Sequence, residues 1–97
     1  MKKLLNNAVE ELMVKVNVEL NNMEKDINIS MSVNAKLRVV RHRKANVTSL
    51  IKRLEQMKQH TEKIFPNDKE LIKRIDDFIF KTDLALTDKT YKAYGCY

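Results

Sequence analysis

The stretch DINISMSVNAKLRVVRHRKANV, residues 26–47, decides the fold because two conformations compete for it. From Ile27 to Val39, every odd position is apolar or alanine and every even position is polar. As a strand, this segment would have one apolar face and one polar face, because successive side chains point to opposite sides. As a helix, the same apolar side chains would be scattered around the whole circumference. The alternation therefore favours a strand.

A shorter alternating run lies upstream, over residues 14–20, where Val and Leu alternate with polar residues. Val, Ile and Ser also have below-average helix propensity. We therefore expect a β-hairpin over residues 13–40, with strands at about 13–20 and 27–39. Against this expectation, no Asn-Gly or Asp-Gly turn joins the two runs. The alternative is an all-α helical bundle, in which one helix runs continuously through the basic segment.

Helical spacing of apolar residues flanks the alternating region. Residues 1–12 predict a short first helix, and residues 45–65 predict a long one that ends before Pro66. Residues 67–86 predict another helix, followed by a tail over residues 87–97. Because only a few residues join the two long helices, we expect them to pack antiparallel and to cover the hairpin. The predicted fold class is α+β.

The composition is typical of one folded, soluble domain. The chain has 97 residues, of which 43% are hydrophobic and 33% are charged, so we expect a single domain with one modest core. No apolar run is long enough to span a membrane, and the basic start lacks the apolar core of a signal peptide. We expect a cytoplasmic protein. Cys96 is the only cysteine, which excludes an intrachain disulfide.

Positive charge is concentrated in one segment. Between Ile27 and Leu54 there is no Asp or Glu, whereas the whole chain has 19 Lys and Arg and 13 Asp and Glu. Removing the seven cations of this segment leaves 12 against 13 acids, so the segment holds the entire net charge of +6. The seven cations are Lys36, Arg38, Arg41, Arg43, Lys44, Lys52 and Arg53.

Uncompensated cations of this kind attract phosphates or an acidic protein surface. Charge runs are usually solvated surface, but four of the seven are Arg, whose planar side chain binds phosphate through two hydrogen bonds. We expect a small nucleic-acid-binding accessory or regulatory protein that contacts phosphates through these seven residues. The alternative is a protein-interaction module, such as a phage-type inhibitor or adaptor, that docks on an acidic surface of a larger machine.

The sequence gives no sign of catalysis. It contains no Gly-rich phosphate loop, no Ser/His/Asp set and no Cys/His set. His42 and His60 are 18 residues apart, about 27 Å along a single helix, so they cannot share a metal ion. We expect no enzyme activity, no cofactor and no metal site.

Phe80 lies off the main apolar stripe of its predicted helix and forms a second apolar edge with Leu84, four residues later. Core residues that spill over the edge of a stripe are the ordinary explanation of such a pair. The more specific explanation is that the pair contacts a partner protein. We predict that Phe80 and Leu84 form an interface, and that the protein is a homodimer.

Overall fold

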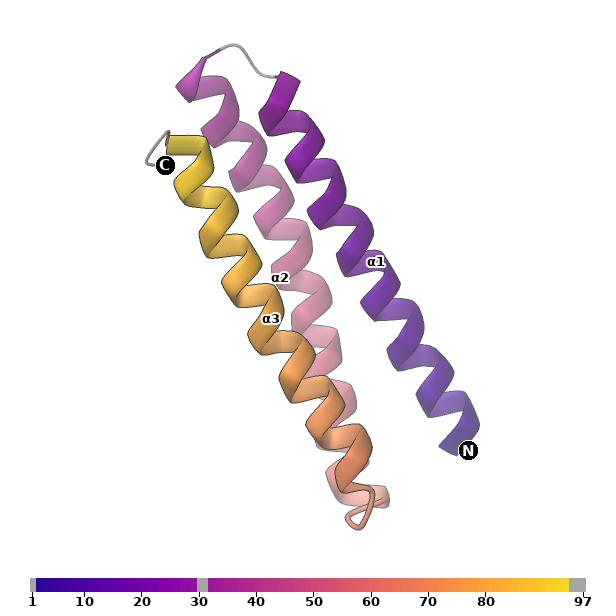
Figure 1. Cartoon of the computed structure of the whole chain (residues 1–97). Coiled ribbons are helices and arrows are strands. Elements are labelled where there is room, and N and C mark those ends of the chain that lie inside the picture. Colours follow the sequence, from indigo (N-terminus) through magenta and orange to yellow (C-terminus); the bar gives the residue numbers. More distant parts are fainter. Residues whose placement is uncertain (1, 30–31, 95–97) are drawn as a thin grey trace.

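The computed structural model describes residues 2–29 and 32–94, which form three long helices (Figure 1). Helix α1 spans Lys2–Ile29, α2 spans Val33–Ile64 and α3 spans Lys69–Tyr94. The chain runs along the bundle, back and along it again, so that α2 is antiparallel to both neighbours. Helix α2 contacts α1 and α3 more extensively than these two contact each other. The bundle is elongated, with extents of 48 × 20 × 14 Å.

The predicted β-hairpin, and with it the α+β fold class, is wrong. Residues 2–29 and 32–94 contain no strand, and the architecture is the all-α bundle that the sequence offered as the alternative. Residues 13–29 continue α1, and residues 33–40 are the first turns of α2. The predicted tail is helical as far as Tyr94, whereas Cys96 lies outside the described residues.

Burial explains why the alternation did not produce strands. Val16 is fully buried, but Val14 and Val18 on the same predicted strand face are 53% and 50% exposed. Ile27 is buried, whereas Ile29 is 75% exposed. Half of the proposed apolar face therefore lies in solvent, because the chain buries every third or fourth side chain and not every second one.

The pattern that determines the fold is a seven-residue spacing of buried core residues. In α1 it relates Val9, Val16 and Met23, and in α2 it relates the buried residues Val40, Val47, Leu54 and Thr61. Heptad spacing of this kind is typical of helices that pack nearly parallel along their length. Helix propensities differ by less than about 1 kcal/mol per residue, whereas burying one large apolar side chain contributes about 1.5–3 kcal/mol. Packing therefore overrides the local preference for strand.

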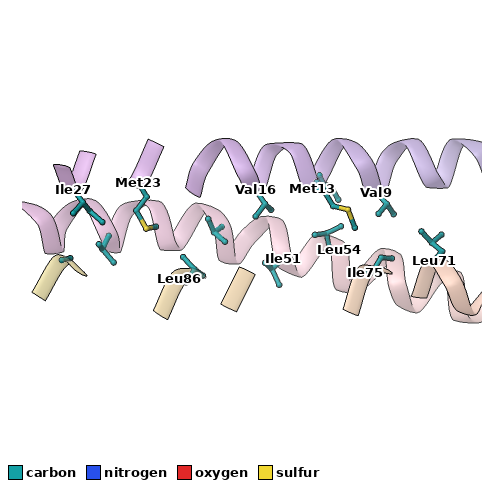
Figure 2. Close-up of a cluster of buried hydrophobic side chains, with 14 residues drawn as sticks. Val9, Met13, Val16, Met23, Ile27, Ile51, Leu54, Leu71, Ile75 and Leu86 are labelled. Atoms are coloured by element: carbon teal, nitrogen blue, oxygen red, sulfur yellow. The ribbon is translucent and has the colours of Figure 1, made fainter. Parts of the chain in front are cut away.

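The core runs the length of the bundle between the three helices (Figure 2). Met13 and Val16 of α1 point toward α2 from one side, and Ile75 and Leu86 of α3 approach it from the other. Leu54 of α2 is fully buried between them. Because α2 is packed on both neighbours, most of its exposed residues between Arg38 and Lys63 lie on the one remaining side.

Short polar residues define the helix ends. The Ser32 side chain accepts a hydrogen bond from the Ala35 amide at 3.1 Å, which caps α2 at its start. Helix α2 ends at Ile64, two residues before Pro66. The Asp68 side chain accepts from the Leu71 amide at 3.4 Å, so it caps α3.

Acidic residues of α1 bind basic residues of the other two helices. Glu24 pairs with Lys89, at 3.0 Å, and with Lys92, both from α3. Hydrogen bonds from Lys92 and then Lys89 hold the pKa of Glu24 below its ordinary value. Glu10 of α1 pairs in the same way with Arg74 of α3. These pairs tie the first helix to the third, where the direct packing is less extensive.

Candidate nucleic-acid interface

All seven cations that the sequence singles out lie on α2, but the helix directs them to different sides. At about 100° per residue, Arg38, Arg41, Lys52 and Arg53 fall within an arc of about 120° opposite the buried Val47. All four are exposed. These four residues are here called the outer face of α2. From Arg38 to Arg53 they span 16 residues, or about 22 Å along the helix axis.

A shallow depression with small side chains lies on this outer face. Its lining consists of Arg41, Lys44, Ala45, Thr48, Ser49 and Lys52. The small residues occupy the middle, and the cations stand at its two ends. Short side chains at the centre allow a ligand backbone to approach the helix closely, while the long cationic side chains reach it from both ends. The hydroxyl groups of Thr48 and Ser49 can donate hydrogen bonds to phosphate oxygens.

Arg43 does not belong to this face, because it binds two carboxylates of α1. Its guanidinium pairs with Glu19 at 3.1 Å and with Asp26 at 3.1 Å, and its Nε donates a further hydrogen bond to Asp26 at 3.2 Å. The Arg43 side chain is only 24% exposed. The hydrogen bond with Glu19, followed by that with Asp26, raises the pKa of Arg43. Arg43 therefore joins α1 to α2 and has few donors left for a ligand.

Lys36 and Lys44 lie outside the outer face. Lys36 is half-buried and has nearly the same helical phase as Val47, on the side opposite the outer face. Lys44 is exposed but also lines a groove with Asp83 and Tyr91 of α3. The structure thus brings together four of the seven predicted residues, places Lys44 beside them, and separates Lys36 and Arg43 from them.

The outer face has no compensating acid. Helix α2 contains no Asp or Glu from its first residue to Leu54. Within residues 2–29 and 32–94, no ion pair involves Arg38, Arg41, Lys44, Lys52 or Arg53. Several acids elsewhere are engaged with other cations, for example Asp76 with Lys58 at 2.7 Å. A positive potential therefore remains along one side of the bundle.

The predicted interface pair lies on a different surface. Phe80 and Leu84 are 64% and 57% exposed, one turn apart on the side of α3 that faces away from the core. Tyr91 is 55% exposed and lies on the same side, two turns further along. Tyr91 was not predicted as part of this surface, because residues 87–97 were expected to form a tail. The spacing of seven residues from Leu84 to Tyr91 was the available signal.

Other kinds of site find no support in the described part of the chain. No group of three or more His, Cys, Asp or Glu side chains there is placed to hold a metal ion. None of the three helices, as described, is long and apolar enough to cross a membrane. No protein-family model matches this sequence, and neither a curated protein nor a solved structure matches it.

Proposed function

We propose that this protein binds nucleic acid through the outer face of α2, as an accessory or regulatory protein and not as an enzyme. The observation that carries the proposal is a row of four exposed cations, on one side of α2, with no ion-pair partner among the described residues. Ordinary surface charge would be interrupted by acids, as it is on α1 and α3. We further propose a cytoplasmic location, which would give this face access to nucleic acid.

The chemistry of the face favours contacts with phosphates over contacts with bases. Between Arg38 and Arg53 the outward positions carry cations, His42, Ala45, Thr48 and Ser49. The one amide side chain at the edge of this arc, that of Asn46, donates a hydrogen bond to Glu19 of α1 and is not directed at a base. Arg and Lys bind phosphate oxygens irrespective of sequence, and each contact releases counterions. We therefore propose weak sequence preference and strong salt dependence. Lys44 adds a fifth contact at the margin of the face.

The rival proposal is an acidic protein surface as the partner, since it would meet the same cations. Titration of fluorescently labelled short duplex DNA, single-stranded DNA and RNA, followed by anisotropy, separates the two. We expect submillimolar binding near physiological salt. No binding to any of the three nucleic acids, even at low salt, would end the nucleic-acid proposal in favour of the protein partner.

A pair of charge-matched variants locates the site. Arg41→Gln with Lys52→Gln removes two charges from the outer face, and Lys3→Gln with Lys25→Gln removes two from exposed positions of α1. Because each phosphate contact contributes independently, the first variant should bind at least tenfold more weakly, whereas the second should change affinity by about twofold or less. Equal losses in the two variants would show that only net charge matters and would refute this site.

A further inference from the structure

Helix α3 carries a second line of large side chains, on the side away from the core. Phe80, Leu84, Tyr91 and Tyr94 are each between 55% and 64% exposed. With Thr87, which is also exposed, their spacing along the helix is four, three, four and three residues. That spacing is typical of a seam that packs against another helix. These five residues are here called the outer seam of α3.

The one polar residue in the middle of the outer seam is already satisfied. The Thr87 hydroxyl donates a hydrogen bond to the Asp83 carbonyl oxygen at 3.0 Å, within α3. A partner that covers Thr87 therefore leaves no buried donor without an acceptor. The other members of the outer seam are apolar or aromatic, so a partner can cover their side chains while the hydroxyl groups of Tyr91 and Tyr94 stay at the rim, in contact with water.

We propose that the outer seam binds the outer seam of a second copy of this chain, with the two α3 helices antiparallel. With the two-fold axis between residues 85 and 86, Phe80 of each copy lies opposite Tyr91 of the other. Leu84 in turn lies opposite Thr87. Phe80 and Tyr91 then form an aromatic pair on each side of the axis, and aromatic pairs are favourable beyond the area that they bury. Tyr94 lies beyond these pairs, at the rim, where Asp77 of the other copy is opposite it. This contact is isologous, so it closes at two copies.

The charges beside the seam select this orientation. Lys81 follows Phe80 and Asp88 follows Thr87, on the same flank of the seam. In an antiparallel pair related by a two-fold axis, each flank meets the same flank of the other copy, so Lys81 meets Asp88 twice. On the other flank, Asp83 meets the neutral Thr90. The antiparallel arrangement therefore gains two ion pairs and brings no like charges together.

A parallel arrangement is less favourable on the same grounds. It would place Asp77 of one copy against Asp77 of the other, within the seam. At the edge of the seam, it would also bring Asp83 of one copy toward Asp88 of the other. Like charges at such positions are destabilising. The antiparallel dimer uses α3 and leaves the outer face of α2 exposed in both copies, so this inference is independent of the proposed function.

Sedimentation equilibrium of the full chain tests the proposal. We expect a mass of 22.8 kDa, twice the 11.4 kDa of one chain, at concentrations of tens of micromolar. Lys81→Asp alone should weaken the dimer roughly tenfold, because each attractive pair becomes a repulsive one. Adding Asp88→Lys to the same chain should restore it, because the pairs then form with reversed signs. Restoration is the result that a merely structural effect of either substitution would not give.

Two leucines of similar exposure provide the apolar control. Leu84→Ala should abolish the dimer, whereas Leu4→Ala, at a residue 72% exposed on α1, should leave it intact. Circular dichroism should show the same helical signal in all of these variants, because none of the substituted side chains is buried. A monomer up to millimolar concentration would overturn the proposal. A dimer that survives Leu84→Ala, or that the charge exchange fails to restore, would also overturn it.

Discussion

Arg41 and Arg43 are two residues apart in the basic segment, and the structure assigns them opposite roles. Arg43 makes three charged hydrogen bonds, of 3.1–3.2 Å, to Glu19 and Asp26 of α1. Arg41 is exposed and makes no ion pair with any described residue. We predict that Arg43→Ala destabilises the fold and that Arg41→Ala does not. Each variant removes one positive charge from nearly the same place, so their difference isolates the ion pairs.

The structure sets the size of the effect. Buried charged hydrogen bonds contribute about 1.5–3 kcal/mol, and exposed ion pairs about 0.2–1 kcal/mol. The Arg43, Glu19 and Asp26 side chains are 24%, 21% and 32% exposed, so water partly replaces what the substitution removes. We expect Arg43→Ala to lower the free energy of unfolding by about 2 kcal/mol, or the melting temperature by roughly 10 °C. Arg41→Ala should change it by less than about 0.5 kcal/mol.

Urea denaturation followed by circular dichroism measures both values. A double-mutant cycle with Glu19→Ala should give a coupling of about 1 kcal/mol between Arg43 and Glu19. Equal stabilities of the Arg41→Ala and Arg43→Ala variants, or no coupling to Glu19, would refute the assignment of Arg43 to the bundle. Arg43 would then return to the set of candidate ligand contacts.

Three further predictions concern the packing of the core, the loss of stability at acid pH and the salt dependence of nucleic-acid binding. Leu54→Ala should lower the free energy of unfolding by about 3 kcal/mol, because Leu54 is fully buried, and a loss below 1 kcal/mol would contradict the packing. Glu24 has a lowered pKa, so its contribution is fully present above its ordinary pKa of 4.5 and is lost as pH falls through the lower folded value. Glu24→Gln should therefore lower the melting temperature at pH 7, by an amount that corresponds to about 1 kcal/mol or less because the Glu24 side chain is 34% exposed. This difference should shrink in acid, and a pH-independent difference would contradict the ion pairs. The logarithm of the nucleic-acid binding constant should fall with the logarithm of salt concentration with a slope of about −4, and a slope near zero would contradict phosphate binding.

The sequence led to the wrong fold class because the alternation over residues 27–39 is a local pattern, whereas the heptad spacing is a long one. The predicted stripe began at Val47, although Val40, seven residues earlier, has the same phase. Extending the stripe back by one heptad carries the helix through the basic segment. The lack of a turn sequence between the two alternating runs pointed the same way, and it was the better signal.

The seven candidate contacts could be identified from charge alone. Charge alone could not show which of them face solvent and which bind other helices. Glu19 and Asp26 lie 24 and 17 residues before Arg43, so their ion pairs depend on how α1 packs against α2. Once α2 is known to be one continuous helix, its phase separates Lys36 from the outer face without further information. Only part of the outer seam of α3 was predicted from the sequence. Phe80 and Leu84 were identified because they lie off the main apolar stripe, whereas Tyr91 was not, because the helix was expected to end before it.

Residue-resolved NMR tests the central claim most directly. A ¹⁵N-labelled sample is titrated with a short DNA duplex, and the shift of each backbone amide is followed. We predict that the largest shifts lie on α2 between Arg38 and Arg53 and repeat every three or four residues along the outer face, while the amides of α1 change little. Shifts centred on another helix, or no shifts at low salt, would contradict the claim that the outer face of α2 binds nucleic acid.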